Sequence, residues 1–328
     1  MSSIAILGAG AMGSAIAKQL ERHKRPIRLF DIDQNVIQAI NEKHENTVYL
    51  PGIKFASHVT ATTELKTAIE KAEVIFVVLP SHCVAQTINE IALSLSPKTI
   101  LVNISKGLDE KTFLPPILSA RLPAIIKKRI CVVGGPAIAQ DLSSQSPTGF
   151  IVASQDLRSQ TIVKKLLQSE NVKVALSKDV KGVGLAAALK NAYAISLGMC
   201  DGLKFPTNAK ALILTVALQE MSLVLTKLGA KQETAYGLAG VGDLVVTGFS
   251  SHGRNRSYGE RLVGAKTKDP KELGLTTVEG ISATKLAIKM VKATRVQAPL
   301  LASIHACLDA NKDFVCPFEG FVKKLILR

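Results

Sequence analysis

The sequence predicts an α/β protein in which a doubly wound sheet is followed by an all-helical domain. From residue 1 to about residue 178, short apolar runs alternate with helix-length segments, which is the pattern of repeated βαβ units. A glycine-rich turn joins the first strand to the first helix. Beyond Asp179 the strand-like runs stop, and apolar residues recur with a helical period. We therefore expect a sheet domain over residues 1–178 and a helical domain over residues 179–328.

The first strand, residues 4–7, leads directly into Gly8-Ala9-Gly10-Ala11-Met12-Gly13, and a helix is expected over residues 12–21. Gly8 permits the tight turn, Gly10 lets the backbone approach a pyrophosphate, and Gly13 lets the helix pack closely on the strand. The helix N-terminus offers N–H groups and a positive dipole end to phosphates. The turn therefore predicts a Rossmann-like, dinucleotide-binding domain.

Asp31 ends the second strand, residues 28–30, about 20 residues after Gly8. A carboxylate at this position accepts hydrogen bonds from the adenosine ribose and repels a 2′-phosphate. Asp31 therefore favours NAD as the cofactor, with NADP still possible. The alternative is that Asp31 only caps the helix that begins near Gln34.

Further strands are expected where short apolar runs recur, and helices where longer segments carry the helical period. The expected strands cover residues 74–79, 99–104, 130–133, 150–153 and 172–176, with crossover helices at residues 83–93 and 159–168 among others. In the second half, helices are expected over residues 181–200, 208–228, 282–292 and 300–310. Asn208 is expected as an N-cap and Gly229 as a C-terminal stop. Ligands are expected in a cleft at the carboxyl ends of the strands.

Composition restricts the class of protein. The chain has 328 residues, 47% of them hydrophobic, which is enough for two domains with their own cores. Much of the net charge of +15 lies along helical stretches, where solvated helix faces are the expected explanation and a functional patch is the alternative. No nucleic-acid-binding module or set of stacking aromatic residues accompanies it, so no nucleic acid partner is expected. A phosphorylated small molecule would use only a few of these cations.

The same sequence indicates location and redox chemistry. The first strand begins close to the first residue, which leaves no room for a signal peptide, so a cytoplasmic protein is expected. No histidine, cysteine or carboxylate spacing is typical of a metal site, and no metal is expected. The cysteines form no C-x-x-C pair and are expected to be buried in a reducing compartment; they are Cys83, Cys131, Cys200, Cys307 and Cys316.

The apolar segment at residues 183–200 carries Lys190 and Asn191 near its middle. Its length would suit a membrane span, but a central lysine and flanking charges favour a buried core helix, so an integral membrane protein is not expected. A desolvated lysine must find an anionic partner or lose its proton, which suits Lys190 to proton transfer. The alternative is a structural ion pair, or a lysine whose head extends to solvent.

Two segments are expected at the carboxyl rim of the sheet, where ligands of such folds bind. Lys106 follows the strand at residues 99–104, and Gly135 follows the strand at residues 130–133. Either segment alone would also suit an ordinary turn.

The helical half carries a further set of polar groups. Asp243 presents a carboxylate in a glycine-rich break between helices. Arg254 offers a planar fork suited to phosphate, and Asn255 adds an uncharged donor. Reduction of a ketone develops alkoxide character, which a nearby lysine ammonium group stabilises and then protonates.

These residues together resemble a known family, the bacterial-type NAD(P)-dependent glycerol-3-phosphate dehydrogenases. The resemblance covers essentially the whole chain, and its segments occur in the family's order. They are Gly8-Ala9-Gly10-Ala11-Met12-Gly13, Ser105-Lys106-Gly107, Gly134-Gly135-Pro136, Leu189-Lys190-Asn191, Asp201-Gly202-Leu203-Lys204, Gly242-Asp243-Leu244, Arg254-Asn255-Arg256 and Val278-Glu279-Gly280.

The resemblance implies reversible hydride transfer between NAD(P)H and dihydroxyacetone phosphate, giving sn-glycerol 3-phosphate for glycerophospholipid precursor synthesis, by a homodimer. It implies that Lys190 is the general acid/base at the C2 oxygen, and that Lys106 and Asp243 share the catalytic site. The implied substrate contacts are Lys106, Gly135, Ala137, Lys190, Asn191, Asp243, Gly253, Arg254 and Asn255. The implied cofactor contacts are Gly8, Gly10, Ala11, Met12, Gly13, Asp31, Lys106, Ala139, Arg254 and Glu279.

Several positions depart from the family pattern. Ala137 and Gly253 stand where serines are usual, which removes two hydroxyl donors from the expected substrate pocket. Met12 replaces an aromatic residue, and Asp31 stands where a basic or neutral residue is common. Two alternatives therefore stay open: an NAD-dependent dehydrogenase of another phosphorylated or carboxylated hydroxy compound, and a degenerate NAD-binding sensor without turnover.

Overall fold

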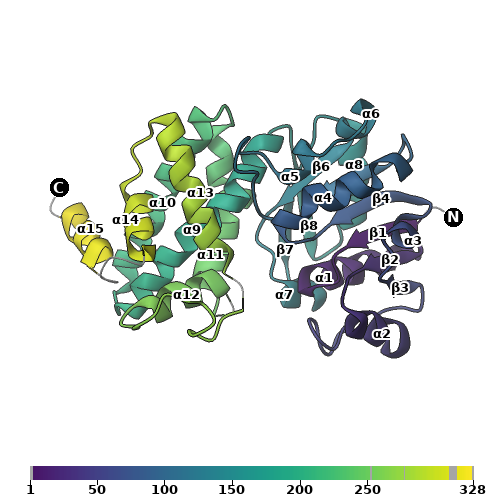
Figure 1. Ribbon diagram of the computed structural model, residues 1–328, viewed down its shortest axis with the longest axis horizontal. Helices are drawn as coiled ribbons and strands as arrows, with labels where there is room; N and C mark the ends of the chain where they lie inside the picture. The colour runs from purple at the N-terminus through teal and green to yellow at the C-terminus, as the bar shows by residue number, and fades with distance from the viewer. Residues whose placement is uncertain (1–2, 252, 277, 310–315, 327–328) are drawn as a thin grey trace. The chain divides into compact units, whose positions relative to one another are not determined.

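The computed structural model describes residues 3–251, 253–276, 278–309 and 316–326 (Figure 1). It divides into two compact units, Met1–Gly184 and Leu185–Arg328, with the division inside the helix α9 (Val180–Gly202). The first unit holds a sheet with helices, and the described part of the second unit is helical. The predicted fold class, a Rossmann-like sheet followed by a helical region, is confirmed.

The first unit is built on one eight-stranded sheet with the order β3-β2-β1-β4-β5-β6-β7-β8. Its strands are β1 (Ser3–Leu7), β2 (Ile27–Phe30), β3 (Val59–Thr62), β4 (Ala72–Val77), β5 (Ile100–Asn103), β6 (Ile130–Gly134), β7 (Thr148–Ala153) and β8 (Val172–Ser177). Neighbouring strands are parallel except β6 and β7, which are antiparallel. The strand order reverses where β1 pairs with β4, and ligands of doubly wound sheets bind beyond the carboxyl ends at such a point.

One strand, β3, is not predicted by the apolar runs of the sequence. It is a four-residue edge strand, and its side chains alternate between the core and the surface. Thr60 and Thr62 break the continuous apolar run that marks the central strands. The antiparallel pairing of β7 is likewise not apparent in the sequence, because a buried strand has the same composition in either direction.

Helices cover the sheet by burying the side chains that alternate along each strand. Ile4 and Ile6 of β1 share one apolar cluster with residues of α1 (Ala11–Leu20), α2 (Gln34–Lys43) and α8 (Leu157–Leu167). Ala5 and Leu7 are also fully buried and point to the opposite face. The remaining elements of this unit are η1 (Glu21–His23), α3 (Leu65–Ile69), α4 (Ser81–Ile91), η2 (Ala92–Ser94), α5 (Pro116–Ser119), α6 (Ala124–Lys127) and α7 (Ala139–Ser143).

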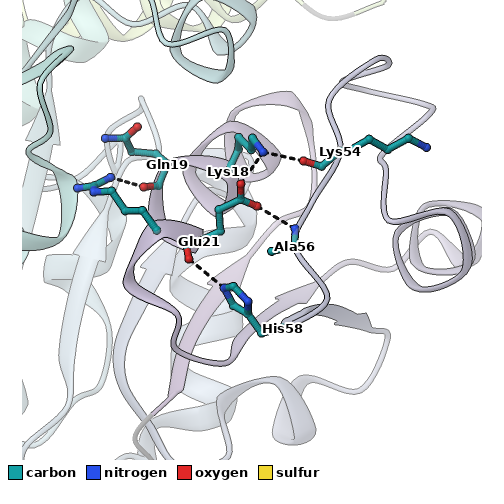
Figure 2. A network of polar contacts seen from close by, with 7 residues as sticks. Lys18, Gln19, Glu21, Lys54, Ala56 and His58 are labelled. Atoms are coloured by element: carbon teal, nitrogen blue, oxygen red, sulfur yellow. Dashed lines mark hydrogen bonds and ion pairs between the residues drawn. The ribbon is translucent and has the colours of Figure 1, made fainter.

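A polar network fastens the end of α1 to the segment that precedes β3 (Figure 2). The Glu21 carboxylate pairs with Lys18 and accepts a hydrogen bond from the Ala56 backbone N–H at 2.9 Å. Lys18 also donates to the Lys54 carbonyl at 2.8 Å, and His58 lies 3.0 Å from the Glu21 carbonyl oxygen. The edge strand is therefore held to α1 by side chains as well as by its pairing with β2.

The described elements of the second unit are all helical. They are α9, α10 (Thr207–Lys227), η3 (Gln232–Tyr236), η4 (Leu238–Gly242), α11 (Asp243–Phe249), α12 (Arg254–Leu262), α13 (Glu279–Thr294), α14 (Pro299–Leu308) and α15 (Cys316–Ile326). Two helices, α9 and α10, are long and apolar enough to cross a membrane by length and composition. The apolar stretch of α9 is 100% buried inside the chain, as expected of a core helix, and that of α10 is 44% buried.

Two local predictions in this unit are wrong. Asn208 is not an N-cap, because α10 already begins at Thr207 and Pro206 occupies the capping position. Asp243 does not lie in a break between helices, because η4 is a π-helical turn that continues directly into α11. The predicted stop at Gly229 agrees with its φ of +76°, a left-handed conformation that favours glycine.

Cys131, Cys200 and Cys307 are buried, as predicted, whereas Cys83 is only half-buried. The side chain of Cys316 lies outside the described residues, as does Ala310 at the predicted end of the last expected helix.

Candidate active site

The glycine turn between β1 and α1 has the geometry of a phosphate cradle. Gly8 has a φ of +106°, and a Cβ atom there would lie 2.7 Å from the Val78 carbonyl oxygen. A Cβ atom on Gly13 would lie 1.8 Å from the Gly8 carbonyl oxygen, so α1 packs directly on the turn. Gly10 differs, because no atom lies within 4 Å of its Cβ position. Ala11 and Met12 form the first turn of α1 and are half-buried. The turn is closed on its protein side and open at Gly10, which fits a dinucleotide pyrophosphate.

Asp31 lies beside this turn, at the carboxyl end of β2. Its Oδ2 atom accepts a hydrogen bond from the Ala9 backbone N–H at 2.7 Å, and its Oδ1 atom accepts one from the Asp33 N–H at 3.2 Å. The N-cap of α2 is Asp33, whose carboxylate accepts a hydrogen bond from the Asn35 N–H at 2.9 Å. The alternative interpretation of Asp31 as that helix cap is therefore wrong.

The other predicted residues of the first unit follow β5 and β6. Lys106 is half-buried in a segment anchored by Ser105, whose hydroxyl donates to the Leu79 carbonyl at 2.6 Å. Gly135 has a φ of +130°, and a Cβ atom there would lie 2.3 Å from the Gly149 carbonyl oxygen. Ala137 and Ala139 are partly buried against the apolar cluster of the sheet. Lys106 and Gly135 thus lie at the carboxyl ends of their strands, as predicted.

The predicted residues of the second unit centre on a buried lysine. Lys190 of α9 is 4% exposed, and its Nζ atom lies 3.1 Å from Asp243 Oδ1. The same Nζ atom donates a hydrogen bond to the Thr247 hydroxyl at 2.6 Å. Asp243 is 1% exposed, and the Thr247 hydroxyl lies 3.5 Å from its Oδ1 atom. We call Lys190, Asp243 and Thr247 the lysine cluster. Lys190 has the anionic partner that its burial demands.

A chain of amide contacts adjoins the lysine cluster. Asn255 Nδ2 donates to Asn191 Oδ1 at 2.9 Å, and Asn255 Oδ1 accepts from the Gly280 N–H at 2.9 Å. Asn191 Nδ2 in turn donates to Glu279 Oε2 at 3.2 Å. These contacts tie α12 and the start of α13 to the residue that follows Lys190 on α9.

Arg254 is exposed at the first position of α12, and Gly253 occupies the N-cap without a side chain to cap the helix. Part of the positive charge nearby is structural. Asp201 accepts from Lys210 at 2.7 Å and from Arg256 at 2.6 Å. Asp201 and Arg256, which belong to two of the family motifs, therefore form an ion-pair network with Lys210. Within the motif Arg254-Asn255-Arg256, the exposed cation is Arg254.

Three polar residues whose side chains hydrogen-bond in the interior are not predicted by the sequence analysis. Thr247 lies four residues after Asp243 on α11, a helical spacing that would have indicated a shared face. Asn46 is fully buried and donates to the Ala9 carbonyl at 2.6 Å, but its segment has no regular period. Glu220 is 3% exposed in α10 and accepts from the Leu300 and Leu301 N–H groups at 2.6 and 3.1 Å. Burial raises the pKa of Glu220 to about 7.

The glycine cradle with its neighbouring acid, followed by a helical unit with a buried lysine–aspartate pair, defines a nicotinamide-dinucleotide-dependent oxidoreductase. Among the described residues, no group of three or more His, Cys, Asp or Glu could hold a metal ion.

Comparison with known proteins identifies the family. Residues 3–160 match the model of the NAD-dependent glycerol-3-phosphate dehydrogenase N-terminus, and residues 179–316 match that of the C-terminus. A glycerol-3-phosphate dehydrogenase [NAD(P)+] from Bacillus subtilis is 34% identical over 99% of this chain and 95% of its own length. One from Streptococcus uberis is 37% identical over 92% and 90%. The crystal structure of glycerol-3-phosphate dehydrogenase from Coxiella burnetii has a TM-score of 0.88 and 29% identity, covering 100% of this chain and 99% of that one. The chain belongs to the NAD-dependent glycerol-3-phosphate dehydrogenase family.

Proposed function

We propose that this chain catalyses the reversible reduction of dihydroxyacetone phosphate to sn-glycerol 3-phosphate with NAD(P)H. The family membership supports this reaction, and relatives of nearly equal length carry that activity in their names. The observation that carries the proposal within the chain is the lysine cluster, in which a buried ammonium group contacts the Asp243 carboxylate and the Thr247 hydroxyl.

Lys190 acts as the general acid in the direction of ketone reduction. Bound NAD(P)H supplies the hydride. The Lys190 ammonium group stabilises the negative charge that develops on the C2 oxygen and then donates a proton to that oxygen. Asp243 keeps the lysine charged before the reaction, because an anion within hydrogen-bond distance favours the ammonium form. Thr247 accepts one ammonium hydrogen and so restricts the direction in which Nζ points.

The remaining predicted residues take the roles that the family resemblance implies. Arg254 and Asn255 bind the substrate phosphate, with Lys106, Gly135, Ala137, Asn191 and Gly253 as further substrate contacts. Gly8, Gly10, Ala11, Met12, Gly13, Asp31, Lys106, Ala139, Arg254 and Glu279 contact the dinucleotide. Ala137 and Gly253 lack the hydroxyl groups of the serines that are usual at these positions. Arg254 therefore contributes a larger share of the affinity for the substrate phosphate than it would beside those serines.

The reaction is tested by following NADH oxidation with dihydroxyacetone phosphate, with dihydroxyacetone and ketopantoate as comparison substrates. Only the phosphorylated ketone should be turned over efficiently. Lys190→Met should lower kcat by about 10²- to 10⁴-fold, the usual contribution of a general acid, and leave NADH affinity nearly intact. Arg254→Gln should mainly raise KM for the phosphorylated ketone. Equal turnover of a ketone without phosphate would favour the other-substrate alternative, and NADH binding without any turnover would favour the sensor.

We also propose a homodimer formed through the exposed face of α10. Leu212 and Leu223 on this helix are 37% and 50% exposed. The ionisable residues of α10 between residues 208 and 226, Lys210 and Glu220, are buried, so the exposed face carries no charge there. Two copies of a chain with a net charge of +15 can approach at this face without bringing like charges together.

The oligomeric state is tested by light scattering. The parent chain should have the mass of a dimer, and Leu223→Glu should have the mass of a monomer. Leu93→Glu, whose side chain is 97% exposed in the other unit, is the control and should have the mass of a dimer. A dimeric Leu223→Glu would rule out this face.

A soluble, cytoplasmic enzyme that feeds glycerophospholipid precursor synthesis is the cellular role we propose. Its product is the phosphorylated glycerol backbone of such lipids. Fractionation of the native host cells, with the activity assayed in the soluble and membrane fractions, tests the location.

A further inference from the structure

We infer that the amino edge of the sheet, at the starts of β5 and β6, binds reversibly to membrane surfaces that contain anionic lipids. The inference goes beyond the proposed reaction and does not depend on it. Exposed aliphatic side chains and cations gather at this edge, all of them in the first unit. We call the set the amino-edge surface, and it comprises Leu93, Lys98, Arg121, Ile125, Lys127 and Lys128.

Two aliphatic side chains of this surface are exposed to water. Leu93 lies in the turn η2 and is 97% exposed, the largest value among the exposed large hydrophobic side chains of the described residues. Ile125 lies in the short helix α6 and is 47% exposed, whereas the next residue, Ile126, is buried. Removal of such side chains from water is favourable, so a partner with an apolar layer gains free energy by covering them.

Positive charge surrounds these aliphatic groups. The four cations of the amino-edge surface are exposed, and two of them lie in or directly after α6. The acids between residues 91 and 140 are Asp109 and Glu110, which follow the carboxyl end of β5 and so belong to the opposite edge. Glu90, near the end of α4, is exposed as well. Four cations therefore stand against one carboxylate, an excess that attracts anionic headgroups.

Hydrogen bonds join the segments that carry these side chains. The Arg121 backbone N–H donates to Asn89 Oδ1 at 2.6 Å, which links the end of α4 to the segment between α5 and α6. Arg129, directly before β6, places its Nη1 atom 3.5 Å from the carbonyl oxygen of Lys98, which precedes β5. Because β5 and β6 are neighbours in the sheet, η2 and α6 belong to one surface. Figure 1 shows α6 at the outer margin of the sheet unit.

The acids that flank the amino-edge surface are engaged by other groups. Near the start of β4, Glu73 lies 2.8 Å from Arg25 and Glu70 lies 3.7 Å from Arg28. On the side of β7, Asp156 is half-buried as the cap of α8. These carboxylates are partly neutralised or withdrawn from solvent, so they oppose an approaching anionic surface less than free carboxylates would.

The mixture of side chains favours a lipid surface over a protein or a nucleic acid. Protein interfaces are enriched in aromatic residues and depleted in lysine, and nucleic acids are bound by cations with stacking aromatic residues. The amino-edge surface has lysines and aliphatic groups and no aromatic residue. Aliphatic side chains can enter the boundary of the acyl chains while neighbouring cations contact lipid phosphates. Contact through so few groups is reversible and weakens with salt.

The test measures binding of the full chain to vesicles by co-sedimentation. The parent chain should bind vesicles of phosphatidylcholine and phosphatidylglycerol in equal parts at least about 10-fold more tightly than vesicles of phosphatidylcholine alone. Lys127→Glu/Lys128→Glu should weaken binding to the mixed vesicles by at least about 10-fold, and Leu93→Ser by about 3- to 10-fold. Turnover and NADH affinity should be unchanged, because the proposed dinucleotide site lies at the opposite edge of the sheet.

Lys285→Glu/Lys292→Glu is the matched control, since it changes the net charge equally at two exposed lysines of α13 in the other unit. It should bind the mixed vesicles like the parent chain. Three results would overturn the inference: no preference of the parent chain for anionic vesicles, an equal loss of binding in the control, or unchanged binding by Leu93→Ser. Binding of a DNA duplex in place of vesicles, abolished by Lys127→Glu/Lys128→Glu, would likewise contradict it and assign the surface to nucleic acid.

Discussion

The glycine turn of the first unit and the lysine cluster of the second unit hold their functional groups by different means. The turn uses backbone geometry within a short stretch of sequence, with a left-handed Gly8 and a Gly13 that must lack a side chain. The lysine cluster uses charged side chains from separate helices, with Lys190 and Thr247 separated by 57 residues. A glycine-to-alanine substitution, which adds one methyl group, is therefore enough to disturb the backbone of the turn. The stability of the lysine cluster depends instead on the balance of opposite charges inside a low-dielectric core.

Stability and function are therefore coupled differently in the two units. An added methyl group at the turn acts through steric contact, and its cost depends on which glycine receives it. Removal of one charge from the lysine cluster takes away the opposite charge that the remaining buried group faces, so the cost appears in the folding free energy as well as in turnover. The following variants separate these two modes, in order of expected effect.

Asp243→Ala should have the largest effect on stability. It leaves the Lys190 ammonium group buried without its anion, which costs about 3–5 kcal/mol of unfolding free energy. The double variant Lys190→Met/Asp243→Leu removes both charges and should recover most of this loss, as measured by urea unfolding. If the single variant is as stable as the parent chain, the Lys190–Asp243 pair is not desolvated. The lysine cluster would then not couple charge to the folding free energy.

Gly13→Ala should cost about 3 kcal/mol, because its Cβ atom would lie 1.8 Å from the Gly8 carbonyl oxygen and α1 would have to move. Gly10→Ala is the matched control. Its Cβ position is open and its φ of −66° suits alanine, so its melting temperature should match that of the parent chain. NADH titration should nevertheless show weaker binding to Gly10→Ala. Equal thermal destabilisation of the two variants would contradict the steric account.

Glu220 provides a charge-based effect in the helical unit away from the lysine cluster. Burial raises the pKa of Glu220 from 4.5 to about 7, although the Leu300 and Leu301 N–H groups oppose the rise. Between these two values the folded chain holds a proton that the unfolded chain has released, so the unfolding free energy falls as pH rises. The total change is up to about 3 kcal/mol.

The measurement is urea unfolding from pH 5 to pH 8 for the parent chain and Glu220→Gln. The difference in unfolding free energy between the two proteins should shift in favour of Glu220→Gln as pH rises. The Tyr193 hydroxyl, 3.4 Å from Glu220 Oε2, titrates far above this range because burial raises the pKa of Tyr193 as well. Parallel pH profiles of the two proteins would show that Glu220 does not titrate there.

Asp156→Ala should have the smallest effect. Asp156 is half-buried and caps α8 by accepting a hydrogen bond from the Ser159 N–H at 3.0 Å, far from either set of functional groups in sequence. Loss of such a cap costs about 1 kcal/mol. Urea unfolding should show this loss, and kcat and NADH affinity should stay unchanged. A change in NADH affinity would mean that the first unit transmits capping defects to the glycine turn.

Sequence patterns predict the features of this protein whose causes lie within a few residues. The glycine turn, the central apolar strands, the stop at Gly229 and the burial of the helix around Lys190 all follow from local backbone preference or from apolar periodicity. The sequence also contains the motifs that indicate the family, in the family's order. Local signals were too weak for the edge strand β3 and for the true caps of α2 and α10.

Which polar groups contact one another depends on the packing of the whole chain. Asp31 accepts a hydrogen bond from the Ala9 N–H, and Asn46 donates one to the Ala9 carbonyl. In the lysine cluster, Thr247 accepts a hydrogen bond from Lys190. These pairings join residues 22 to 57 positions apart, and each could have been made with many other partners of the same chemistry. Hydrogen bonds and ion pairs gain most where water is excluded, so their choice of partner depends on how the whole chain packs rather than on the residues beside them.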